Sequence, residues 1–179
     1  MALQPLLQHY PDVVVSVDTF RSSVARQCVE KYGVSMINDI SGGELDERMF
    51  DTVAQLRVPY IMMHMRGTPQ TMQQQTDYED VTADLLKYFS QKLERLFRLG
   101  VNDVILDPGF GFSKTLTQNY ELMRHLGDFR IFGLPLLVGV SRKSMIYKLL
   151  ETTPEESLNG TTVLHTYALL QGADILRVH

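Results

Sequence analysis

The sequence predicts an α/β fold built on a parallel sheet, and three observations lead to this class. Short apolar segments of strand length alternate with longer segments of helical periodicity. No short hairpin turn joins two of the strands, and polar residues follow the end of every strand. This alternation is typical of right-handed βαβ units, in which a helix carries the chain back to the start of the next parallel strand.

The first half of the chain supplies three strands. Residues 1–10 have leucines at helical spacing, and we expect them to form the end of a helix that Pro11 stops. The later elements are a strand at Val13–Val17, a helix at Arg21–Tyr32 capped by Thr19 or Ser22 and closed by Gly33, a strand at Ser35–Ile37, a helix through Met49, Val53 and Leu56, and a strand at Pro59–Met63.

The second half supplies three more strands. Apolar residues at helical spacing predict a long amphipathic helix at Val81–Leu99, which Gly100 closes. The later elements are a strand that begins at Val104, a helix at Asn119–Leu126, a strand at Leu134–Val140, a helix that begins around Ser141–Ser144, a helix from Pro154 to Leu170 capped by Thr153, and a strand at Ile175–His179.

The positions of the polar residues favour a barrel over an open sheet. In a doubly wound sheet the functional residues gather at one switch point, whereas here all six strands end in polar residues, as in a (β/α)8 barrel. Such a TIM barrel needs eight strands and roughly 250 residues. We therefore expect an incomplete TIM barrel of about six strands, forming one domain over residues 1–179, without the first two strands and the last helix.

Composition and charge exclude several classes of function. The 179 residues are 44% hydrophobic and carry a formal charge of −4 without long runs of one sign. This distribution offers no basic surface for nucleic acid and no cationic face for a membrane. Cys28 is the only cysteine, and the sequence has neither a signal-like start nor an apolar run of membrane-spanning length. These features predict a cytoplasmic protein.

We expect the chemistry to converge on residues 104–112, where an apolar strand ends in Asp-Pro-Gly-Phe-Gly-Phe. Pro108 favours an extended backbone at Asp107, and the two glycines allow positive φ or close approach of a flat ligand. Asp107 is therefore expected at the end of a buried strand, facing a cleft, with the two aromatic residues leaning toward solvent. A surface turn is the alternative, because Asp-Pro-Gly is common turn chemistry.

Polar side chains at three strand ends suit a flat heterocycle that carries N–H donors. Asp18, Asn38 and Asp107 offer two carboxylates and an amide. Lys143 adds a donor for a carbonyl oxygen, and backbone N–H groups near Ser144 could receive a carboxylate. The alternatives are caps of βα turns for the acids and the amide, and a solvated basic pair for Lys143.

Two further sets of residues could contact ligands. Arg177 and His179 alternate on the last predicted strand and could hold a pyrophosphate or a similar anion, although each alone is compatible with a surface position. His64 has no second His or Cys at metal-ligand spacing, so a zinc site is not expected. Met62 or Met63 is expected to pack against the flat face of a ligand.

Six motifs in this order resemble those of the dihydropteroate synthase family. They are SVDT, INDIS, MHMRGTPQTM, DPGFGF, GVSRKS and RVH, each at a predicted strand end. The resemblance extends from about Val15 to the terminus and implies a TIM-barrel enzyme of folate biosynthesis. Members of the family join 6-hydroxymethyl-7,8-dihydropterin pyrophosphate to 4-aminobenzoate and release pyrophosphate, and sulfonamides compete with the aminobenzoate.

The resemblance also implies roles for individual residues. The pterin would be bound by Asp18, Asn38, Asp107 and Lys143 and enclosed by Ile40, Met63 and Gly139. Phe112, Lys143 and Ser144 would border the aminobenzoate, and Arg177 and His179 would hold the pyrophosphate. Asp18, Asp107 and Lys143 are the expected catalytic residues, because carboxylates near the ring would stabilise the cation that forms when pyrophosphate leaves.

Two loops of the family pattern have no counterpart in this sequence: an Asn-Val-Thr-Pro-Asp-type loop and a Ser-Thr-Arg-type loop. The resemblance implies that they supply the Mg²⁺ ligand and part of the aminobenzoate and phosphate site, so no metal ligand is expected in this chain. It also implies a homodimer for the full-length enzyme. Two alternatives stay open: a pterin-binding module without synthase activity, and the pterin domain of corrinoid methyltransferases, whose pattern lacks Ser141–Ser144 in this form.

Overall fold

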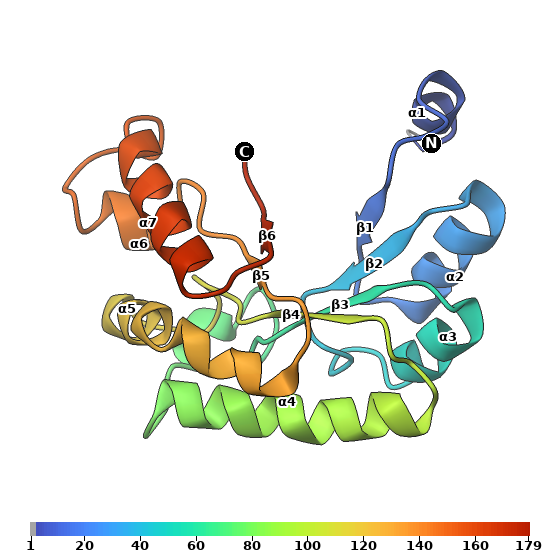
Figure 1. The fold of residues 1–179 in the computed structure, drawn as a ribbon, viewed down its shortest axis with the longest axis horizontal. Coiled ribbons are helices and arrows are strands. Elements are labelled where there is room, and N and C mark those ends of the chain that lie inside the picture. Colours follow the sequence, from blue (N-terminus) through green and yellow to red (C-terminus); the bar gives the residue numbers. More distant parts are fainter. Residues whose placement is uncertain (1–2) are drawn as a thin grey trace. The chain divides into compact units, whose positions relative to one another are not determined.

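The computed structural model describes residues 3–179 and confirms the α/β class (Figure 1). Six strands alternate with helices in this part of the chain. The structure divides into two compact units. The first unit contains the described residues up to Met63 together with Lys92–Val104, and the second contains His64–Gln91 and Ile105–His179. None of the helices in residues 3–179 has the length and apolar character needed to cross a membrane.

In the first unit, three strands form a parallel sheet in chain order. β1 (Ser16–Asp18) pairs with β2 (Met36–Asp39), and β2 pairs with β3 (Tyr60–Met63). The helices of this unit are α1 (Leu3–His9), α2 (Ser22–Tyr32), α3 (Met49–Leu56) and the later part of α4 (Val81–Arg98). α2 packs against α3 (Figure 1).

The core of the first unit matches the apolar pattern of the sequence. Cys28 of α2 is buried, and Ile37 and Val53 have no exposed surface. Gly33 ends α2 with a φ of 65°, as predicted. The predicted capping of α2 by Thr19 or Ser22 is wrong, because Arg21 is the N-cap residue and makes no side-chain cap bond.

The second unit contains the remaining strands. β4 (Val104–Asp107) belongs to it from Ile105 onward, and a parallel bridge joins Leu106 to Leu136. β5 (Leu137–Val138) pairs in parallel with β6 (Ile175–Leu176). The helices are the first part of α4, η1 (Met72–Gln74), α5 (Leu116–Arg124), η2 (Leu126–Phe132), α6 (Ser144–Tyr147) and α7 (Leu158–Leu170). Phe89 and Phe129 meet edge to face in its core, with ring centroids 5.8 Å apart.

The predicted strands differ from the observed ones at their ends. The strand at Val13–Val17 is observed as Ser16–Asp18, because the Val13 N–H donates to the Tyr10 carbonyl in a turn and Val14 is 72% exposed. The fifth strand begins at Leu137 rather than Leu134. Pro135 has no N–H, and the Leu136 N–H donates to the Asp174 carboxylate at 2.9 Å.

The helix predicted for residues 1–10 is confirmed as α1, and residues 1 and 2 lie outside the described part of the chain. Two other predicted helices need correction. α5 begins at Leu116 rather than Asn119, since Thr115 and Gln118 form a capping box. α7 begins at Leu158 rather than Pro154. The Arg142 guanidinium donates to the carbonyls of Pro154 (3.2 Å) and Glu155 (2.7 Å), which helical N–H groups would otherwise use.

Candidate functional site

The predicted site residues fall into two groups, one in each unit, and most of them lie at or just after the carboxyl ends of strands. The first group contains Asp18, Asn38, Ile40 and Met63. The second contains Asp107, Phe112, Gly139, Lys143, Ser144, Arg177 and His179. The parallel strands place the members of each group on one edge of a sheet. That both groups serve one ligand stays a prediction.

Asp18 and Asn38 lie opposite each other in the β1–β2 register. The amide Nδ2 of Asn38 donates to Oδ1 of Asp18 at 2.7 Å. Because a carboxylate only accepts, this bond fixes the amide orientation. Oδ1 of Asn38 is then a buried acceptor without a hydrogen-bond partner among residues 3–179. An unsatisfied buried acceptor costs about 1–3 kcal/mol, which a ligand N–H at this position would recover.

A pocket of about 410 Å³ opens beside Asp18, and Ile40 is part of its wall. The loop that carries Ile40 is held by Asp39, which is fully buried. Its carboxylate accepts hydrogen bonds from the Tyr60 hydroxyl (2.8 Å), from the backbone N–H and hydroxyl of Ser41, and from the Gly43 N–H. Met63 is buried at the end of β3. This anchoring role of Asp39 is not readable from the sequence, because Tyr60 is a distant partner.

Asp107 ends β4 and is only 6% exposed, which excludes the surface-turn alternative. Its Oδ1 accepts the Gly109 N–H at 2.8 Å. Burial raises the pKa of the Asp107 carboxyl, whereas Lys143, the Gly109 N–H, Lys114 and Arg177 act to lower it. The prediction that both aromatic residues of the loop lean toward solvent is wrong for Phe110. Its side chain has no exposed surface and packs into the core.

Lys143 precedes α6, and its ammonium contacts the loop after β4. The Nζ donates to the Phe110 carbonyl at 2.5 Å and lies 4.7 Å from the centre of the Phe112 ring. Burial is the main cause that lowers the pKa of Lys143 to about 8, and Asp107 opposes that shift. The solvated-pair alternative is therefore wrong for Lys143. Gly111 permits this contact, because a Cβ there would lie 3.3 Å from Cδ of Lys143.

The other predicted residues of this unit differ in exposure, since Gly139 is buried and Ser144 is half-buried. Arg177 and His179 are exposed, and the His179 N–H donates to the Ser141 hydroxyl at 3.3 Å. Gly139 lies beside the Arg177 side chain, since a Cβ added at Gly139 would meet it at 3.6 Å, an ordinary van der Waals distance. Ser144 begins α6, which has only four residues and thus a weak dipole for a bound carboxylate.

Sequence reasoning missed Lys114, which is 4% exposed. Its Nζ donates to the carbonyls of Gly109 (3.1 Å) and Phe112 (3.0 Å) and shares a hydrogen bond with Nδ1 of His64 (3.1 Å). Burial is the main cause that lowers the pKa of Lys114 to about 7. Its position after a glycine-rich turn gave no signal of burial, because the partner His64 is fifty residues away in the sequence.

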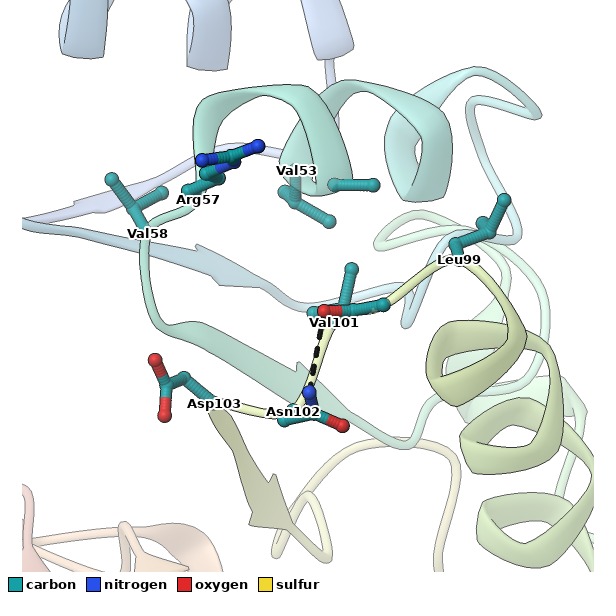
Figure 2. Close-up of a pocket in the computed structure, with 9 residues that line it drawn as sticks. Val53, Arg57, Val58, Leu99, Val101, Asn102 and Asp103 are labelled. Atoms are coloured by element: carbon teal, nitrogen blue, oxygen red, sulfur yellow. Dashed lines mark hydrogen bonds between the residues drawn. The ribbon is translucent and has the colours of Figure 1, made fainter.

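Figure 2 shows a different pocket of the first unit, with a volume of about 420 Å³. Val53, Arg57 and Val58 come from the end of α3 and the segment before β3, and Leu99–Asp103 come from the segment between α4 and β4. The Asn102 amide donates to the Gly100 carbonyl at 3.5 Å. This pocket lies at the amino ends of strands, whereas α/β barrels carry their active sites at the carboxyl ends.

Comparison with known proteins decides the family. The model of the family described as Pterin binding enzyme matches residues 2–179. The chain belongs to the Pterin binding enzyme family. A relative from Synechocystis sp., named dihydropteroate synthase, is 44% identical over 171 residues, which is 94% of this chain and 59% of that protein. The chain therefore spans about three fifths of the length of this relative.

Solved structures of Pterin binding enzymes agree with the fold. Dihydropteroate synthase from Thermus thermophilus in complex with 4-aminobenzoate matches with a TM-score of 0.93 and 37% identity, over 99% of this chain and 68% of that one. The Yersinia pestis enzyme in a sulfonamide drug complex gives a TM-score of 0.92 and 38% identity, over 99% and 64%. The predicted fold class, a TIM barrel of which this chain carries six strands, is confirmed.

Proposed function

We propose that the protein carrying this chain is a dihydropteroate synthase, which joins 6-hydroxymethyl-7,8-dihydropterin pyrophosphate to 4-aminobenzoate. The position of Lys143 is the observation that carries the proposal. Its ammonium lies against the Phe112 ring and the Phe110 carbonyl, and its charge acts on the buried Asp107. One cation thus lies between a carboxylate suited to a pterin N–H edge and an aromatic ring suited to the aminobenzoate.

The residues of the chain act by binding and electrostatics. The bond between the pterin methylene carbon and the pyrophosphate oxygen breaks, and pyrophosphate leaves with the electron pair. The aniline nitrogen of 4-aminobenzoate then forms the new C–N bond and releases a proton. Asp107, in its buried position, would stabilise the positive charge that develops on the ring system. Arg177 and His179 would receive the departing pyrophosphate at the exposed end of the chain.

Asp18 and Asn38 would also bind the pterin. The unpartnered Oδ1 of Asn38 and the Asp18 carboxylate both accept hydrogen bonds, so they favour a ring edge with neighbouring N–H groups. Ile40, Met63 and Gly139 would enclose the ring. Phe112 and Ser144 would border the aminobenzoate, where sulfonamides would compete.

Mg²⁺ is the proposed cofactor, and it would supply charge neutralisation for the pyrophosphate. Among residues 3–179 no group of three or more His, Cys, Asp or Glu side chains could hold a metal ion, so these residues do not by themselves fit a Mg²⁺ site. The proposed setting is the cytoplasm, as a homodimer, with small-molecule substrates and no nucleic-acid or membrane partner, in keeping with the charge of −4.

Product formation tests the proposal. The natural protein is incubated with pterin pyrophosphate, 4-aminobenzoate and Mg²⁺, and 7,8-dihydropteroate is measured by mass spectrometry. We expect product that depends on both substrates and is inhibited competitively by a sulfonamide. Pterin binding without product would contradict the proposal and support the alternative of a binding module. The same reaction with Asp107→Asn should form less product, which tests whether the chemistry takes place at this site.

A further inference from the structure

The loop between β4 and α5 is held from two sides by lysines. Lys143 donates to the Phe110 carbonyl, and Lys114 donates to the carbonyls of Gly109 and Phe112. The Lys114 bonds thus link Gly109 to Phe112, whose ring contacts Lys143. Asn119 of α5 fixes the same loop, since its Oδ1 accepts the Gly111 N–H at 2.7 Å and its amide donates to the Lys114 carbonyl.

The three partners of Lys114 saturate its ammonium. An ammonium has three donors, and here two point to loop carbonyls and the third lies 3.1 Å from Nδ1 of His64. A neutral amine would keep both carbonyl bonds, and its lone pair would accept a hydrogen bond from the Nδ1–H of the other His64 tautomer. The loop contacts therefore survive either protonation state. His64 is itself buried and meets the Tyr88 ring edge to face at 4.8 Å.

We propose that Lys114 is a positioning residue that sets the place of the Phe112 ring, and through it the affinity for 4-aminobenzoate. The inference rests on the proposed synthase function. Without Lys114, the Phe112 carbonyl loses its ammonium donor, and the Gly109 carbonyl keeps only its bond from the Phe112 N–H (3.1 Å). The Phe112 carbonyl must then turn toward water, which moves the backbone of Phe112. Lys143 acts more strongly than Lys114 on Asp107, so pterin binding should change little.

The test uses Lys114→Met in the natural protein, because methionine keeps most of the stem and removes the ammonium. We expect the KM for 4-aminobenzoate to rise at least tenfold, with less than a threefold change in the Kd for 6-hydroxymethylpterin. Lys87→Met is the matched control, since Lys87 is an exposed lysine of α4 in the same unit. This control should leave both constants unchanged.

A double-mutant cycle separates positioning from a general loss of structure. In a Phe112→Ala background, Lys114→Met should change the KM for 4-aminobenzoate less than twofold. If the Met variant does not fold, Lys114→Arg takes its place, and the larger planar group should raise the KM severalfold. An unchanged KM in an active protein, or an equal effect with and without Phe112, would overturn the inference alone. A wild-type protein that makes no dihydropteroate would overturn the proposed function and the inference with it.

Discussion

Replacing Asp107 by asparagine should weaken pterin binding while sparing 4-aminobenzoate. The amide has the shape of the carboxylate, and its oxygen can keep the 2.8 Å bond from the Gly109 N–H. The amide NH₂ must then take the place of the second carboxylate oxygen. A donor would face the ligand where an acceptor was, and the negative charge beside Lys143 and Lys114 would be lost.

The magnitude follows from these two losses. A hydrogen bond to a charged group contributes about 1.5–3 kcal/mol, which corresponds to roughly a 10- to 150-fold change in the pterin Kd. The charge on Asp107 raises the pKa of both lysines, so its removal lowers these pKa values further. Less of the Lys143 ammonium then remains at neutral pH. For this reason we expect the upper part of the range.

Calorimetry with 6-hydroxymethylpterin, and separately with 4-aminobenzoate in the presence of pyrophosphate, measures the effect. The aminobenzoate Kd should change less than threefold. Asp103→Asn is the matched control, because Asp103 is an exposed residue that lies before β4 rather than at its carboxyl end. An unchanged pterin Kd, or equal losses for the two ligands, would refute the assignment of Asp107 to the pterin.

Three other outcomes follow from the same contacts. Lys143→Ala should raise the dissociation constants of both ligands at least tenfold, and calorimetry showing a change in only one would refute a shared role. Gly111→Ala should lower the free energy of unfolding by about 1–2 kcal/mol in urea titrations. It should cost more than Gly100→Ala, which has a similar φ of 79° but no atom within 4 Å of the added Cβ. Because Lys114 and Lys143 have folded pKa values of about 7 and 8, below the ordinary 10.5, the unfolded chain binds more protons above pH 7. The free energy of unfolding should therefore rise from about pH 7 to 10, by up to about 1.4 kcal/mol per pH unit for each lysine. If Lys114→Met left the slope of this free energy against pH unchanged, the prediction would be wrong.

The sequence was sufficient to predict those elements whose structure is decided by the local pattern of residues. β3 and β4 were predicted from apolar runs that end in polar residues, and both are fully buried in the structure. Gly33 was predicted as a helix end and has the positive φ that this role requires. The spacing of Thr115 to Gln118 is that of a capping box, so this helix start was readable from the sequence, although the prediction placed it at Asn119.

Tertiary contacts decided what the sequence could not show. Nothing near Lys114 in the chain indicates that His64 will lie beside it. The start of α7 depends on Arg142, which takes the carbonyls of Pro154 and Glu155 from a segment that has good helix-start chemistry. In each case the deciding partner is distant in the sequence, and local periodicity cannot reveal it.

The fixed orientation of the Asn38 amide limits which ligands can bind beside it. Asp18 holds the amide so that its oxygen, and not its nitrogen, is the atom left without a partner. A heterocycle with a ring carbonyl or an unprotonated nitrogen at this point would bring two acceptors together, and the amide could not turn over without losing Asp18. The pair would therefore select one tautomer of a pteridine. Oxidised or deaminated analogues that exchange a donor for an acceptor should be rejected even though their shapes are nearly identical.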